Sequence, residues 1–98
     1  MSLLGIDIGT SSCKVAVFHE DGQVLASASA SYAVSYPASG YAQQSAEVWW
    51  DAACQALKDL WETVSPACIN AVGVDGQGWS PVLMDKNGDV LEPTPLWL

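Results

Sequence analysis

The chain has 98 residues, and its 11 acidic side chains against 3 lysines give a formal net charge of −8 at pH 7. Such a surface repels phosphate backbones and anionic lipids, which argues against nucleic acid or a membrane as the main partner. Half of the residues are hydrophobic and five are Trp, so the composition indicates a folded domain or part of one. No apolar run is long enough to span a bilayer, and no basic region precedes the first one, so we expect a cytoplasmic protein.

The first two predicted strands, Leu3–Ile8 and Cys13–His19, form a hairpin over 3–19 around a tight Gly-Thr-Ser-Ser turn. The first strand is nearly continuous in apolar residues, as expected for a strand that is covered on both faces. The turn places a carboxylate, three hydroxyls and one cation at a single edge of the sheet. These residues, together with the glycine of the turn, are Asp7, Gly9, Thr10, Ser11, Ser12 and Lys14.

Two interpretations of this turn stay open on turn chemistry alone. In the first, backbone N–H groups and hydroxyls surround a phosphate, Gly9 lets the anion approach, and Asp7 holds Mg²⁺ through water. In the second, the segment is an ordinary turn in which Asp7 and Ser12 only satisfy the backbone. The pattern is not a Walker loop, since GxxxxGK[ST] is absent.

An Asp-Gly pair within 20–23 favours a tight turn into a third strand at Val24–Val34. Serines alternate with apolar residues along this strand, which predicts one polar and one apolar face. Three consecutive strands joined by short turns predict an antiparallel meander.

A loop at 36–45 leads into a helix that we predict over about 46–64. Ser45 can cap its first turn, and Ser65-Pro66 is expected to end it. Trp49 and Trp50 are both expected to pack rather than to bind a ligand. The apolar face at helical spacing consists of Trp49, Ala52, Ala53, Ala56, Leu60 and Val64. The loop segment 40–44 is interpreted as a cleft wall or as a plain linker.

A further apolar strand at 69–74 ends in Asp75-Gly76-Gln77-Gly78-Trp79, which defines a second candidate site over 75–80. Ligands of open α/β sheets bind beyond the carboxyl ends of strands. The amide of Gln77, the bare backbone at Gly78 and the flat face of Trp79 suit the mixed surface of a sugar. The alternative is a turn whose Trp packs back onto the sheet.

A right-handed crossover through the helix would make the strand at 69–74 parallel to the first strand. The predicted order, β-β-β-α-β, is typical of an α/β fold of the ribonuclease-H-like (actin-like ATPase) type. An Asn-Gly turn predicts a further hairpin between Pro81–Met84 and Val90–Glu92. The chain ends directly after an aromatic residue, so we expect it to be a partial N-terminal domain that lacks a C-terminal domain.

The side chains outside these segments carry little chemistry. The three cysteines are widely spaced, which favours reduced and mostly buried thiols over a zinc site. No Ser/His/Asp or Cys/His arrangement is credible.

Three stretches together resemble the N-terminal part of the FGGY family of carbohydrate kinases, within the sugar kinase/Hsp70/actin superfamily. They are GIDIGTSSCKVAVFHEDGQVL, GYAQQSAEVWWDAA and AVGVDGQGWSPVLMDKNGDVLEPTPLW, in the order and spacing of the family. Within it, the chain is most similar to xylulokinase-like members. It departs from their Gly-Gln-x-His-Gly pattern, because Trp79 and Ser80 replace the His and the second Gly.

The resemblance implies ATP-dependent phosphorylation of a sugar, most of all a pentulose such as xylulose, with ATP and Mg²⁺ as cofactors. It implies that Asp7 is the metal-associated carboxylate. The residues implied around the phosphate are Gly9, Thr10, Ser11, Ser12 and Lys14, and those implied at the sugar are Gln77, Gly78 and Trp79.

The resemblance also implies that the family's catalytic-base Asp lies beyond Leu98, so the 98-residue chain is expected to be inactive by itself. A small-molecule sugar is the expected partner, and a homodimer is compatible with the pattern. The alternative function is a non-catalytic α/β module that binds a ligand or a partner.

Overall fold

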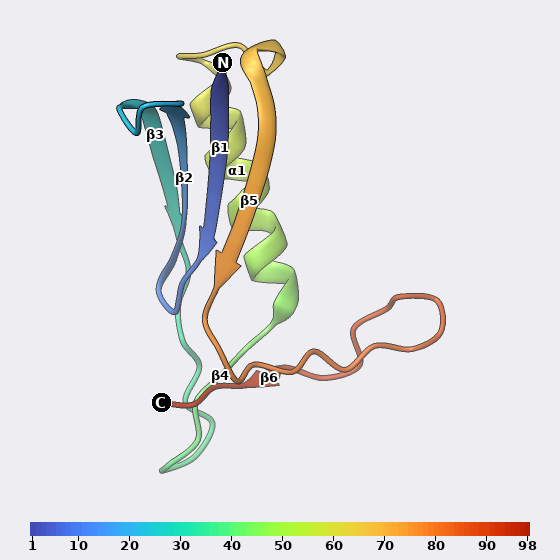
Figure 1. The fold of residues 1–98 in the computed structure, drawn as a ribbon. Coiled ribbons are helices and arrows are strands. Elements are labelled where there is room, and N and C mark those ends of the chain that lie inside the picture. Colours follow the sequence, from blue (N-terminus) through green and yellow to red (C-terminus); the bar gives the residue numbers. More distant parts are fainter.

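A four-stranded sheet with strand order β3-β2-β1-β5 carries the fold (Figure 1). Its strands are β1 (Ser2–Ile8), β2 (Ser12–His19), β3 (Val24–Ser31) and β5 (Ile69–Gly76). The first three are antiparallel, and β5 is parallel to β1. The computed structural model describes residues 1–98. The predicted meander and the predicted parallel strand are confirmed.

The strand β3 is shorter than predicted, because it ends at Ser31 instead of Val34. Ser31 is the partner of Ser12, the first residue of β2, so β2 offers no pairing position beyond it. On the opposite edge of the sheet, β5 runs on to Gly76, two residues beyond the predicted end, because Ile8 at the end of β1 still pairs with it.

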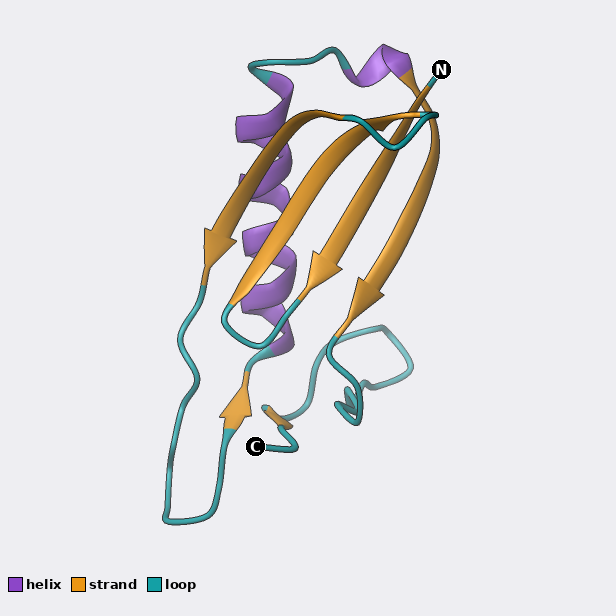
Figure 2. Cartoon of the chain, turned by 60° about the vertical axis from the view of Figure 1, so that its left-hand side comes forward, coloured by secondary structure: helices purple, strands orange, loops and turns teal.

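The helix α1 (Ala46–Trp61) lies across one face of the sheet, behind the strands in Figure 2. Ser45 caps it as predicted: its Oγ accepts a hydrogen bond of 3.3 Å from the Glu47 N–H. The prediction that the helix reaches Val64 is wrong, because the bonds from the N–H of Glu62 and Thr63 tighten to the i−3 carbonyl. A short 3₁₀ helix, Pro66–Cys68, follows and leads into β5.

The apolar side of α1 and the inner face of the meander form the core. Seven buried residues make up this core, namely Leu4, Cys13, Val15, Val17, Ala52, Ala56 and Leu60. The apolar face predicted for the helix is therefore confirmed at its centre. Trp50, in contrast, is 72% exposed, so the prediction that both tryptophans pack is wrong for this residue. It directly follows Trp49, and neighbouring helical residues point to different sides.

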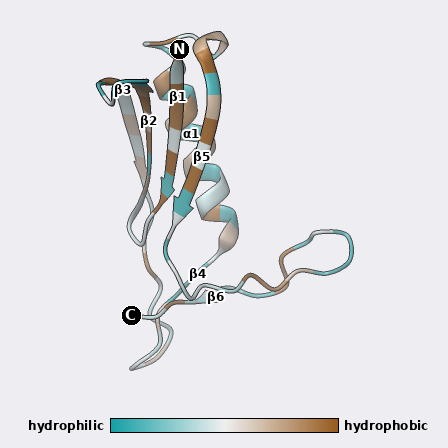
Figure 3. Ribbon diagram, viewed as in Figure 1, coloured by the Kyte–Doolittle hydropathy of each residue, from teal (hydrophilic) through white to brown (hydrophobic).

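The second face of the sheet carries no helix, which contradicts the prediction that the first strand is covered on both faces. Figure 3 shows apolar residues along β1, β2 and β5. Leu3, which lies on this face, is 37% exposed. Val72 and Val74 lie on the helix side, in register with Leu4 and Ile6, and are 56% and 68% exposed because α1 packs mainly on β2 and β3 and leaves the edge strand β5 open. The sequence pattern correctly indicated that these strands are apolar. The structure differs from the prediction because its single long helix, α1, covers only one side of the sheet.

A second, two-stranded sheet was not predicted. It consists of β4 (Gln43–Gln44) and β6 (Thr94–Pro95), which pair antiparallel at the carboxyl end of the main sheet. The Leu96 N–H extends this contact with a 2.8 Å bond to the Ala42 carbonyl. Strands of two residues have no sequence pattern of their own, so this pairing depends on long-range contacts.

The predicted hairpin at 81–92 forms only in part. The Asn-Gly turn is present, with Gly88 at φ +85 and its N–H bonded to the Asp85 carbonyl at 3.1 Å. The flanking segments, however, contribute a single bridge between Met84 and Val90 instead of two strands. This loop projects away from the sheet (Figure 1), so no neighbouring strand or helix stabilises it.

None of the helices combines the length and the apolar character that crossing a membrane requires.

The conformation of Gly22, in the Asp-Gly turn between β2 and β3, predicts how a substitution there changes stability. This residue adopts φ +94, and a Cβ there would meet no atom within 4 Å. Gly22→Ala should therefore lower the free energy of unfolding by about 1 kcal/mol through backbone strain alone. The matched control is Gly73→Ala, since Gly73 also has open space but no positive φ. Urea unfolding that finds equal stabilities for the two variants would contradict this account.

The three thiols differ more than the sequence suggested. Cys13 is buried, but Cys54 and Cys68 are exposed, so the prediction of mostly buried thiols is wrong. Burial raises the pKa of the Cys13 thiol, and the nearby negative charge of Asp7 raises it further. A raised pKa means less thiolate at a given pH, and the thiolate is the reactive form. Iodoacetamide at pH 8 should modify Cys54 and Cys68 within minutes and leave Cys13 intact, as judged by peptide mass spectrometry.

Candidate functional site

The two predicted sites meet at one end of the sheet because β1 and β5 run parallel in register. Asp7 pairs with Asp75, and Ile8 pairs with Gly76. The Gln77 N–H then donates to the Ile8 carbonyl at 2.9 Å, which keeps the two strand ends together. The hydroxyl-rich turn after β1 and the Gly-Gln-Gly-Trp segment after β5 therefore open on the same side.

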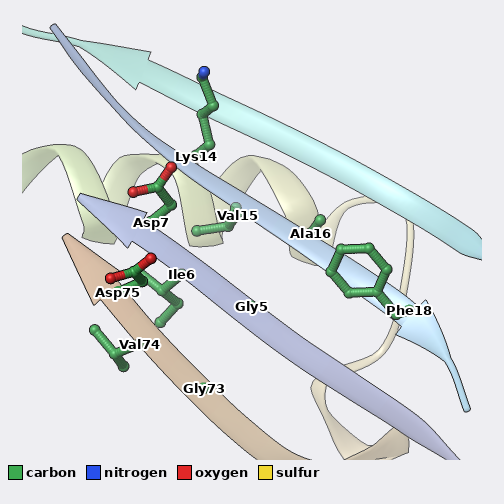
Figure 4. A pocket seen from close by; sticks show the side chains of 10 residues that line it. All are labelled: Gly5, Ile6, Asp7, Lys14, Val15, Ala16, Phe18, Gly73, Val74 and Asp75. Carbon is green, nitrogen blue, oxygen red and sulfur yellow. The ribbon is translucent and has the colours of Figure 1, made fainter. Parts of the chain in front are cut away.

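A groove on the uncovered face leads to this end of the sheet (Figure 4). Its volume is about 470 Å³. It is deepest where Gly5 and Gly73, which have no side chains, lie side by side in the register of β1 and β5. Figure 4 shows Asp7, Lys14 and Asp75 at one end of the groove and Phe18 at the other. The groove therefore has mostly apolar walls and charged side chains at one end.

A second cavity, of about 520 Å³, lies directly beyond the strand ends. Its walls combine the turn after β1 with the segment after β5, and Asp7 lines both this cavity and the groove. The lining residues are Asp7, Gly9, Thr10, Gly76, Gln77, Gly78, Trp79 and Trp97. The structure thus brings together six of the nine residues that the sequence predicted.

The remaining three predicted residues do not line this cavity. Ser11 is exposed at the tip of the turn, and Ser12 opens β2, where its carbonyl accepts from the Gly9 N–H at 2.9 Å. Lys14 lies on the uncovered face, directly opposite Asp7 in the cross-strand register. Lys14 and Asp7 are both exposed and form no ion pair with each other. The charges of both side chains are available to a ligand at the end of the groove.

Two N–H groups of the turn are free for a ligand. The N–H groups of Thr10 and Ser11 donate to no backbone group, whereas the Gly9 N–H is used inside the turn. A Cβ at Gly9 would lie 3.1 Å from the Ser12 carbonyl oxygen, so the turn closes most easily around glycine. Successive free N–H groups in a tight turn are the donors that anion-binding concavities use.

Tyr32 supports this turn from the end of β3. Its hydroxyl donates to the Gly9 carbonyl, and its own N–H donates to the Ser11 carbonyl at 3.0 Å. Burial raises the pKa of Tyr32 to about 12, and the negative charges of Cys13, when ionised, and Asp7 act in the same direction. The phenol therefore stays protonated and keeps its role as a donor up to strongly alkaline pH.

Trp79 is 90% exposed and adopts φ +60, the only positive φ outside glycine. The alternative in which this Trp packs back onto the sheet is wrong, because its face is open to the cavity and to solvent. A bulky residue in the left-handed region is uncommon, and such outliers concentrate at functional sites. Trp97, which the sequence analysis did not single out, lines the same cavity and is 64% exposed.

Gln44 is the second residue that the sequence analysis missed. The segment 40–44 was interpreted as a cleft wall or a linker, but none of its residues lines the cavity. Gln44 instead is 2% exposed behind the turn, where its side chain bonds to Thr10 and to Gln77. No local pattern distinguishes it from its neighbour Gln43, because its partners are distant in sequence.

With this geometry established, comparison with known proteins identifies the family. The model of the N-terminal domain of the FGGY family of carbohydrate kinases matches residues 2–98. The chain belongs to this family. It is 37% identical over 94 residues to the xylulose kinase of Escherichia coli (strain K12), an alignment that covers 96% of this chain and 19% of that protein.

Solved structures of sugar kinases share the fold. Xylulose kinase from Rhodospirillum rubrum matches with a TM-score of 0.89 and 31% identity, over 98% of this chain and 20% of that one. Glycerol kinase from Plasmodium falciparum with ADP matches with a TM-score of 0.81 and 19% identity, a likeness of fold alone, over 98% of this chain and 20% of that one. The α/β fold of the actin-like ATPase type is confirmed. The chain spans about a fifth of the length of the curated relatives it matches.

Proposed function

We propose that this FGGY chain supplies the phosphate-binding turn and part of the sugar pocket of an ATP-dependent sugar kinase. The observation that carries the proposal is the shared cavity of about 520 Å³, in which the turn after β1 faces the segment after β5. Phosphoryl transfer depends mainly on positioning and on neutralising charge, so its phosphate and acceptor sites must adjoin. The xylulose kinase relatives favour a pentulose such as xylulose as the substrate.

The turn offers donors for the transferred phosphate. The free N–H groups of Thr10 and Ser11 and the hydroxyl of Ser11 would donate to its oxygens, with Gly9 leaving the backbone accessible. Ser12 adds a second hydroxyl at the start of β2, and Lys14 adds a positive charge opposite Asp7. The division of these roles is our proposal for the phosphate side of the site.

The carboxylate of Asp7 fits a Mg²⁺ site. It is exposed at the end of β1, it borders both cavities, and Asp75 lies beside it in register. Mg²⁺ commonly uses one or two carboxylates, several waters and the substrate phosphates, so no larger protein cage is needed. When bound, the ion would neutralise charge on the transferred phosphate, and Asp7 would orient it toward the turn.

On the sugar side, Gln77 would bond to hydroxyl groups, Gly78 would leave room for the ring or chain, and Trp79 would cover an apolar face. The 90% exposure and positive φ of Trp79 support a ligand-facing role. We propose that the group that takes the proton from the attacking hydroxyl lies outside residues 1–98. We also propose that these residues form part of the N-terminal domain of a kinase. The cytoplasmic location and the assembly stay predictions.

The proposal is tested on the longest reading frame that encodes this chain. The purified protein is incubated with ATP, Mg²⁺ and a panel of pentuloses, hexuloses and polyols, and ADP release is coupled to NADH oxidation. We expect turnover with at least one ketose, and none from the 98-residue chain by itself. An absence of turnover across the panel would favour the non-catalytic binding module instead.

A further inference from the structure

The side-chain amide of Gln44 connects four separate segments of the chain. Its Nε2 donates to the Thr10 carbonyl at 2.7 Å and to the Ala33 carbonyl at 3.3 Å. Its Oε1 accepts from the Trp49 indole Nε1 at 2.8 Å and from the Gln77 Nε2 at 3.1 Å. With Gln44 only 2% exposed, its two N–H donors and two acceptor positions are therefore all used inside the protein.

The orientation of this amide is determined by its partners. An indole N–H can only donate, so it requires the Gln44 oxygen on the side of Trp49. A carbonyl can only accept, so Thr10 requires the Gln44 nitrogen on the opposite side. A flipped amide would face a donor with a donor, and a Glu at this position would face two carbonyls with an oxygen.

The bond to Thr10 sets the direction of the adjacent free donor. The peptide unit is planar and trans, so the carbonyl of Thr10 and the N–H of Ser11 point in opposite directions. Gln44 holds that carbonyl toward the protein interior, and the Ser11 N–H, which has no backbone partner, then points outward. Gln44 thereby aims one of the two donors that the phosphate side offers.

The bond to Gln77 acts on the sugar side in the same way. The Gln77 Nε2 is shared between Gln44 and the Gly9 carbonyl, at 3.1 and 3.4 Å. The Gln77 Oε1 therefore points toward Thr10, whose hydroxyl donates to it at 3.4 Å. Both residues line the cavity. The remaining acceptor position of that oxygen can take a hydroxyl of the sugar.

We infer that Gln44 is a positioning residue that holds the phosphate turn and the sugar-binding amide in one fixed relation. The inference rests on the proposed function, and it concerns a residue that itself touches neither substrate. Its physical basis is that the acceptor hydroxyl and the phosphate must meet within a narrow range of geometry, and an error of about 1 Å can cost about a hundredfold in rate.

The test uses Gln44→Met in the full-length protein, which keeps the shape of the side chain and removes its four hydrogen bonds. The matched control is Gln43→Met, since Gln43 is the neighbour on β4, is half-buried and takes no part in this cluster. We expect kcat of Gln44→Met to fall by about 10- to 100-fold, while Gln43→Met stays within about twofold of the wild type. Urea unfolding is measured alongside, and kcat is referred to the folded fraction.

A double-mutant cycle with Gln77→Ala separates positioning from a purely structural role. If Gln44 acts through Gln77, the loss of kcat/KM for the sugar caused by Gln44→Met should be smaller by at least about threefold in the Gln77→Ala background. Strictly additive losses, or a Gln44→Met variant that loses stability but keeps the wild-type kcat, would overturn the inference while the proposed function stands. A wild-type protein without turnover on any sugar would overturn both.

Discussion

Asp7→Asn is expected to lower kcat/KM of the full-length protein by about 100- to 1,000-fold, the usual loss when one electrostatic contact to the transferred group is removed. The substitution keeps the size of the side chain and removes the negative charge that would hold Mg²⁺. The fold should not suffer, because Asp7 is exposed and forms no ion pair. Its register partners are Lys14 on β2 and Asp75 on β5, so the loss of one attraction and of one repulsion should largely offset each other.

The measurement is the initial rate at saturating ATP over a series of Mg²⁺ concentrations. The variant should also need more Mg²⁺ for half of its maximal rate, since a neutral amide is a weaker ligand for a hard cation. Asp51→Asn is the matched control, because Asp51 is an exposed carboxylate on α1 that lines neither the groove nor the cavity beyond the strand ends. Unchanged kcat/KM and an unchanged Mg²⁺ dependence in Asp7→Asn would refute the metal role.

Leu60→Ala is expected to lower the free energy of unfolding by about 3 kcal/mol, because it removes three buried carbon atoms and leaves a cavity. Leu60 is 1% exposed on the inner side of α1, within the core of seven buried residues that joins the helix to β1 and β2. So small a core has few neighbours that can move in to fill the space. The chain should therefore lose much of its stability.

Urea unfolding of the 98-residue chain, followed by circular dichroism, provides this measurement. Leu91→Ala is the matched control, since Leu91 is 61% exposed in the projecting loop and its truncation should cost less than about 0.5 kcal/mol. Leu60→Met keeps the volume and should cost less than about 1.5 kcal/mol, which keeps the test informative where Leu60→Ala does not fold. Equal losses for Leu60→Ala and Leu91→Ala would show that the described core does not stabilise the chain.

The two sides of the candidate site were predicted with unequal success. The turn residues Gly9 and Thr10 were identified because tight turns and hydroxyl groups have local signatures. That they share a cavity with Gln77 followed from a topological rule, namely that parallel strands end on the same side of a sheet. Trp97 was missed, since its place on the cavity wall depends on the pairing of β6 with β4, two segments about fifty residues apart in the chain.

The amino-acid sequence by itself determined the meander, the Ser45 cap, the inner face of α1 and the tight turn after β1. Each depends on interactions within a few residues, or on a periodicity of two or 3.6, and both are readable in one dimension. The tertiary structure alone decided that Cys13 is buried while Cys54 is exposed, that the second face of the sheet is uncovered, and that Gln44 rather than Gln43 lies behind the turn. Whether a side chain is buried, and which hydrogen bonds it forms, depends on which distant segments pack together. The same residue type can therefore be buried at one position and exposed at another.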